Sequence, residues 1–173
     1  MATPFHVEIV SPERTVWSGE ADEVSMRTET GEIAFLARHE DFVGAADVTV
    51  VRITTAAVEG SEHAGEVRVA VHGGFVHVDQ DESSVRILAG VAELASEIDV
   101  ERARRALEAA EAAGGAERPM AQGSPGAAPP DDADHARARP SGALLAMLEP
   151  DAPEVAARRA RVRLEAAGVP VAS

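Results

Sequence analysis

The amino-acid sequence contains no cysteine among its 173 residues, which excludes disulfide bonds and metal sites built on thiolates. Lysine is absent as well, so every basic side chain is an arginine. Heavy use of alanine, arginine, glycine and proline is typical of a GC-rich coding sequence, and the missing lysine therefore indicates little about function. Aromatic residues make up only 3% of the chain, so valine and isoleucine must fill most of any core.

Long apolar segments and catalytic signatures are also missing. No apolar run approaches the ~20 residues needed to cross a bilayer, and the first residues lack the basic and apolar regions of a secretory signal. The sequence has no Gly-x-Ser-x-Gly elbow, His-Glu-x-x-His helix, P-loop or dinucleotide fingerprint. We therefore expect a soluble, cytoplasmic protein that is not an enzyme by itself.

The histidines do not indicate a metal centre. His72 and His77 are five residues apart, which places them on opposite faces of a continuous strand. His39 stands beside Glu40 and Asp41 in a predicted loop, where polar surface is the favoured interpretation over metal binding. No metal site is therefore predicted.

Charge is strongly acidic and unevenly distributed. The formal net charge is −14, and residues 1–97 hold 18 acidic and 6 basic side chains. Residues 151–173 are the exception, with 3 acidic side chains and 4 arginines. The acidic bulk argues against nucleic-acid binding, which requires a basic footprint; a solvated surface that aids solubility explains it.

Residues 5–91 alternate apolar and polar positions in short segments separated by turn signals. Ser11-Pro12-Glu13-Arg14, for example, predicts a turn with proline at its second position. Short strands at this spacing indicate a β-sandwich or barrel, which we assign to residues 1–95. We expect strands at residues 6–10, 16–20, 23–28, 33–36, 47–55, 67–71, 75–78 and 85–88.

The hydrophobic period then changes from two to about 3.6, which predicts helices. A first helix is expected at residues 96–113, with Ser96 to Asp99 as its start. Residues 114–142 are dominated by Ala, Gly, Pro, Ser and Asp and predict a disordered linker. Residues 143–173 hold a second helical segment, with its helix from about Glu154 to Ala167. Each helix carries one narrow, alanine-rich stripe, so we expect the two to dock weakly.

Four arginines gather on the second helix, opposite its alanine stripe, and span about 200° of its circumference. They are Arg158, Arg159, Arg161 and Arg163. A solvated face is one interpretation, and a surface for an acidic partner is the other. Val155 and Val162 lie within the same arc and would be exposed unless something covered them, which favours the partner surface.

Several phrases resemble the epsilon subunit of bacterial rotary ATP synthases. They include Gly31-Glu32-Ile33, the run Ala70 to Phe75, Ala92-Glu93-Leu94 and the run Ile98 to Ala103. The resemblance covers residues 5–113 almost continuously and resumes at about 154–165. It implies a ten-strand β-sandwich followed by an antiparallel two-helix hairpin, here interrupted by the long linker.

The resemblance also implies partners and a function. The chain would be a non-catalytic central-stalk subunit, peripheral on the cytoplasmic side of the plasma membrane, that couples the gamma subunit to the c-subunit ring. Glu32 and His39 would lie at the contacts with the ring or gamma, and the membrane would be met only through the ring. The basic helix would inhibit ATP hydrolysis by entering the alpha/beta catalytic head transiently.

Some family members bind ATP on the folded hairpin. The corresponding residues here are Glu93, Ile98, Asp99, Arg102, Arg159 and Arg163. A further family arginine is replaced by Ala109, so we expect ATP binding to be weak or absent, with no other cofactor. The alternative function from another class is a free-standing ligand- or nucleotide-sensing sandwich with a regulatory helical tail.

Overall fold

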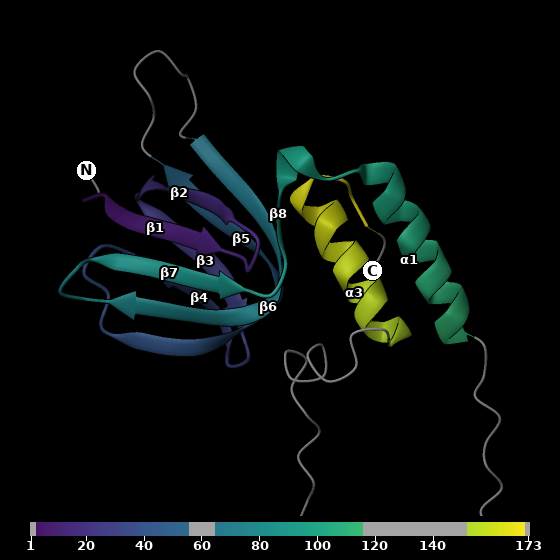
Figure 1. The fold of residues 1–173 in the computed structure, drawn as a ribbon, viewed down its shortest axis with the longest axis horizontal. Helices are drawn as coiled ribbons and strands as arrows, with labels where there is room; N and C mark the ends of the chain where they lie inside the picture. Colours follow the sequence, from purple (N-terminus) through teal and green to yellow (C-terminus); the bar gives the residue numbers. More distant parts are fainter. Residues whose placement is uncertain (1–2, 56–64, 116–151, 172–173) are drawn as a thin grey trace, which may run out of the picture.

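The computed structural model describes residues 3–55, 65–115 and 152–171, which form a β-sandwich with two helices beside it (Figure 1). The helices are the 3₁₀ turn η1 (Ala95–Glu97), α1 (Val100–Gly115) and α3 (Pro153–Ala166). The strands are β1 (Phe5–Val10), β2 (Thr15–Ala21), β3 (Glu23–Thr28), β4 (Gly31–Phe35), β5 (Phe42–Thr55), β6 (Gly65–Asp79), β7 (Ser84–Ala89) and β8 (Ala92–Leu94).

The strands follow the order β2-β1-β7-β6-β5-β3-β4, and β8 pairs with β6. Neighbours are antiparallel except for β1 and β7. The described residues thus hold eight strands, and the expectation of ten is wrong in this respect. The separate strands predicted at 67–71 and 75–78 are one strand, β6, because its pairing with β5 continues on both sides of Gly73-Gly74.

The alternation of β5 and β6 nevertheless reverses at the point where both strands bend. In β6, Val71 and Val76 both face the main core, although an unbroken alternation would put them on opposite faces. Gly73 and Gly74 permit the bend with φ values of +89° and +149°. A Cβ atom on Gly74 would lie 2.1 Å from the carbonyl oxygen of Leu88, so no larger residue fits there.

The main core lies inside the sandwich and is built mainly from valine and isoleucine, as predicted. Its largest fully buried side chains are Phe35, Ile9, Ile53, Ile87, Val7, Val24, Val51, Val69, Val71, Val76 and Val85.

Helix α1 starts four residues later and ends two residues later than the predicted 96–113, and residues 95–97 form the 3₁₀ turn η1. The start of α1 and the end of α3 carry ordinary capping signals. Asp99 caps α1, since its carboxylate accepts a hydrogen bond from the Arg102 amide at 2.9 Å. Gly168, with φ +76°, closes α3, and the bonds Gly168 N–Glu165 O and Val169 N–Leu164 O form a Schellman motif. Residues 116–151, which include most of the predicted linker and the first part of the second helical segment, lie outside the described residues.

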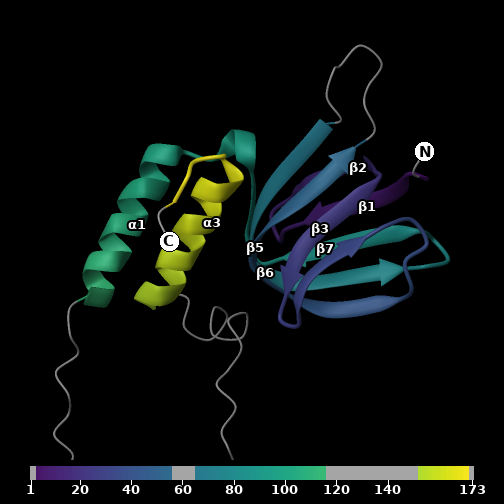
Figure 2. The ribbon, with the colours of Figure 1, turned by 180° about the vertical axis from the view of Figure 1, so that it is seen from behind.

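Helix α3 lies between the sandwich and α1, and the view from behind shows the same arrangement (Figures 1 and 2). On one side α3 contacts α1 through the predicted alanine stripe, in which Ala103, Ala110, Ala160 and Leu164 are buried. On the other side it contacts β5 and β6. We call α1 and α3 the arm, and the contact of α3 with the sandwich the arm joint.

Candidate functional site at the arm joint

An apolar cluster, separate from the main core, holds α3 on the sandwich. Val155 and Val162 are 4% and 7% exposed, so the expectation that an outside partner must cover them is wrong. The sandwich covers them, because apolar side chains on the face of β5 and β6 opposite the main core pack against α3. The cluster consists of Val48, Val50, Ala70, Ile98, Val155, Val162 and Ala166.

Ion pairs surround this cluster and involve most of the basic helix. Arg158 pairs with Asp47 of β5, whose side chain is only 10% exposed. Arg163 donates three hydrogen bonds to Glu93 of β8, at 2.6, 3.0 and 3.1 Å. Acidic side chains of the same chain thus pair with two of the four arginines in this arrangement.

Two further pairs tie α3 at its exposed edges. Arg161 pairs with Glu111 of α1 at 2.8 Å, and Glu165 pairs with Arg52 of β5 at 2.6 Å. Exposed pairs of this kind contribute about 0–1 kcal/mol each. The apolar cluster and the partly buried ion pairs therefore contribute most of the free energy that holds α3 on the sandwich.

His72 of β6 lies beneath α3. Its side chain is 1% exposed, and neither ring nitrogen finds a hydrogen-bond partner among the described residues. Burial, and then the positive charges of Arg163 and Arg159, lower the pKa of His72 to about 4. The ring is therefore neutral when the arm is docked.

A surface pocket of about 260 Å³ opens beside the joint. It brings together four of the residues expected for nucleotide binding, and Ile98 is buried nearby. Arg159 and Ala109 are not among the lining residues, and Ala109 is exposed on α1. The pocket is lined by Glu93, Glu97, Asp99, Arg102, Ala103, Ala106 and Arg163.

The charged groups of this pocket already serve other contacts. The hydrogen bonds from Arg163 hold the pKa of Glu93 below its usual value, and Arg14 does the same for the pKa of Glu97. Asp99 accepts the cap bond of α1. A phosphate entering the pocket would have to compete with Glu93 for Arg163, next to two further carboxylates.

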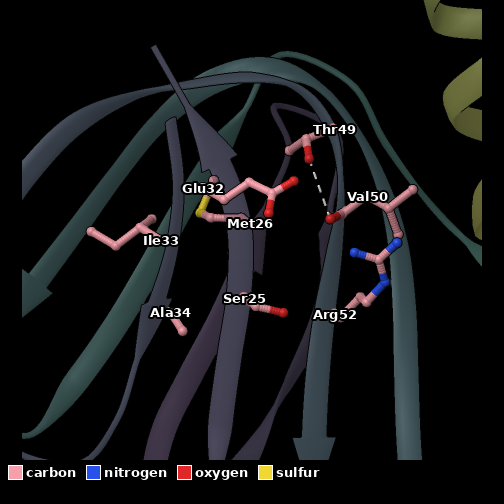
Figure 3. Close-up of a pocket in the computed structure, with 8 residues that line it drawn as sticks. All are labelled: Ser25, Met26, Glu32, Ile33, Ala34, Thr49, Val50 and Arg52. Atoms are coloured by element: carbon pink, nitrogen blue, oxygen red, sulfur yellow. Dashed lines mark hydrogen bonds between the residues drawn. The ribbon is translucent and has the colours of Figure 1, made fainter. Parts of the chain in front are cut away.

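Glu32 and His39 do not lie together. Glu32 is exposed near the start of β4, whereas His39 follows the end of that strand and packs edge-on against Phe35. Figure 3 shows Glu32 with Arg52 and Thr49 around a shallow pocket of about 270 Å³ between β3, β4 and β5. His39 lies near the β6–β7 turn instead, since the amide of the adjacent Arg38 donates to Ser83 at 3.3 Å.

Comparison with known proteins decides the family. Residues 4–95 match the β-sandwich domain of the ATP synthase delta/epsilon chain. The chain is 48% identical over 110 residues to the ATP synthase epsilon chain of Streptomyces griseus, a match that covers 64% of this chain and 82% of that protein. The chain belongs to the ATP synthase epsilon chain family. This family is one of non-catalytic subunits.

Other relatives support the same family assignment. It is 49% identical over 106 residues to the epsilon chain of Thermobifida fusca, which covers 61% of this chain and 73% of the relative. A chain of the mitochondrial ATP synthase of Euglena gracilis, solved with OSCP, F1 and the c-ring, shares the fold. It has a TM-score of 0.56 and 24% identity, and the match covers 67% of this chain and 69% of that one.

The family match ends at residue 95, immediately before the arm. Among the described residues, no helix is both long and apolar enough to cross a membrane. These residues also contain no group of three or more side chains suited to a metal ion.

An exposed apolar row crosses four strands of this epsilon-family sandwich. Pairing places Val10 opposite Leu88, Leu88 opposite Phe75, and Phe75 opposite Ala45. Phe75 is 53% exposed and Leu88 48% exposed, although both are apolar. A groove of about 380 Å³ runs along this row beside Pro12. We call these four residues the apolar row.

Sequence reasoning missed the apolar row, although the sequence contained a signal for it. Phe75 shares its face with His77, and Leu88 shares its face with Arg86, so alternation alone points both apolar side chains outward. An apolar side chain that alternates with polar ones on a solvent face indicates an interaction surface. The burial of His72 gave no such signal, because it depends on where α3 docks.

Proposed function

We propose that this chain is a central-stalk subunit of ATP synthase, peripheral on the cytoplasmic side of the plasma membrane. Its sandwich would couple the gamma subunit to the c-subunit ring, and its arm would restrain ATP hydrolysis. The family match over residues 4–95 is the observation that carries this proposal.

The apolar row is the surface that we assign to gamma. A stable subunit contact needs an apolar centre, and the apolar row provides one on an otherwise acidic sandwich. Glu32, near the start of β4, is assigned to the c ring. His39, at the opposite end of β4, is assigned to the ring as well, because this five-residue strand is short enough for one contact surface to cover both of its ends.

Co-purification tests the coupling role. A tagged chain should bring down gamma and the c ring from native membranes, and Phe75→Asp should abolish the recovery of gamma. Leu36→Asp is the matched control, because Leu36 is 54% exposed but lies outside the apolar row. A wild-type chain that recovers neither gamma nor the ring would refute the rotor role. If both variants lose gamma equally, only the assignment of gamma to the apolar row is refuted.

The arm is the element that we assign to the brake. Its basic residues would bind an acidic surface of the alpha/beta head when α3 leaves the sandwich. In the docked arm, Asp47 and Glu93 hold two of these arginines, Arg158 and Arg163. Docking on the sandwich and binding to the head therefore compete for the same side chains.

Nucleotide binding at the pocket of Glu93 and Arg163 is proposed to be weak. The pocket measures about 260 Å³, which is below the ~300–1,000 Å³ of typical ligand sites. Its lining carries three carboxylates and two arginines, so it offers no net positive charge for phosphate. Isothermal titration with MgATP checks this, and tight binding abolished by Asp99→Ala would overturn it.

A further inference from the structure

The arm joint contains one titratable group that docking places in an unfavourable environment. His72 is buried, its ring nitrogens are unpartnered within the described part of the chain, and a basic helix covers it. An imidazolium at this position would lose its hydration and face the positive charges of α3. We propose that His72 makes docking of the arm sensitive to pH, so that acidification protonates its ring and releases α3 from the sandwich.

The charged groups around His72 come from two elements. Helix α3 contributes Arg163 and Arg159, both of which disfavour a proton on the ring. Strand β8 contributes Glu93, whose Oε1 lies 4.0 Å from the ring Nε2 and favours the proton. Arg163 engages both oxygens of Glu93, and its own charge disfavours the proton on the ring more than this carboxylate favours it while the arm is docked.

Undocking reverses each of these effects at once. When α3 leaves, the ring becomes accessible to water, the two arginines depart, and Glu93 is freed beside the ring. The pKa of His72 then returns to at least its ordinary value of ~6.5. Undocking also removes the arginine that lowers the pKa of Glu93, but an ordinary glutamate is still ionised at mildly acidic pH.

The direction of the pH effect on docking follows from the linkage between docking and protonation of His72. The pKa of His72 is lowered to about 4 in the docked form, so the undocked form binds the proton more tightly. Docking is therefore at full strength above pH ~6.5 and weakens as the pH falls from there toward ~4. Between about pH 7.5 and about pH 5.5 the docking equilibrium constant should fall about tenfold.

The absence of cysteine makes a direct measurement possible. Fluorophores on Asp81→Cys, in the exposed β6–β7 turn, and Glu154→Cys, in the first turn of α3, would report docking of the full chain by energy transfer. Salt or urea is first raised until half of the arms are undocked at about pH 7.5. At about pH 5.5 the docked fraction should then fall from one half to about one tenth.

This inference rests on the proposed function in one respect only: α3 must be able to leave the sandwich. Variants can therefore test the two separately. In His72→Gln and His72→Leu the arm should dock, and docking should no longer depend on pH. His77→Gln, which alters an exposed histidine on the same strand, should retain the pH dependence. An unchanged response in both His72 variants, or no response in the wild type, overturns the role of His72 alone. If α3 never separates before Trp17 fluorescence reports unfolding of the sandwich, the movable arm of the proposed function fails as well.

Discussion

Val162 offers a way to loosen the arm without touching its arginines. Its side chain is 7% exposed and lies in the apolar cluster of the joint rather than in the main core. The substitution Val162→Ala removes apolar contact with β5 and β6 and leaves a small void. The basic helix remains intact in this variant, so docking changes while the proposed head-binding surface does not.

The size of the effect follows from the buried methyl groups. Loss of two methyl groups with partial collapse of the void costs about 1–2 kcal/mol. This corresponds to a decrease of roughly 5–30-fold in the docking equilibrium constant. The free energy of unfolding of the sandwich should hardly change, because the joint cluster and the main core are separate.

Energy transfer between labels on Asp81→Cys and Glu154→Cys measures docking, and Trp17 fluorescence in urea measures unfolding of the sandwich. Val51→Ala is the matched control: Val51 is fully buried in the main core, close in sequence to Val48 and Val50. It should destabilise the sandwich and leave docking at low urea unchanged. In the assembled ATP synthase, Val162→Ala should lower ATP hydrolysis, since the arm is released with its arginines free to bind.

Two results would refute this reasoning. A docking constant within about twofold of wild type would show that the apolar cluster does not hold α3. Higher hydrolysis by the assembled enzyme would show that the released arm is not an inhibitor.

Three other predictions follow from the structure. Gly74→Ala should prevent folding of the sandwich or lower its melting temperature strongly, because the added Cβ atom would lie 2.1 Å from a carbonyl oxygen. Circular dichroism measures this, and Gly90→Ala, where the space is open, is the control. A chain ending at Glu97 should fold, because the main core excludes the arm, but it should expose the apolar side chains of the joint and bind a hydrophobic dye; an unfolded spectrum would contradict this. Replacing the four arginines of α3 (Arg158, Arg159, Arg161 and Arg163) with alanine should raise ATP hydrolysis, which is the opposite of the effect of Val162→Ala. ATP synthesis and assembly should stay nearly intact, and unchanged hydrolysis would contradict the prediction.

Local patterns in the sequence determined the order and type of the elements. Alternation predicted the strands except for β8 and the first part of β5, and the alanine stripes predicted the pairing of α1 with α3. Asp99 marked the start of one helix and Gly168 the end of the other. These signals are readable because a helix or strand repeats its environment every few residues. The phrases around Glu93 and Ile98 also identified the family correctly.

Tertiary structure alone decided what the basic helix contacts. Val155, Val162 and Arg158 give the same helical pattern whether they face a foreign partner or the chain's own sandwich. Their true neighbours on β5 and β6 are more than 80 residues away in sequence and lie on the face of these strands opposite the main core. The burial of His72 depends on the same event, because only docking of α3 removes its ring from water. Periodicity describes one element at a time, whereas burial and charge pairing at the arm joint arise from the packing of several.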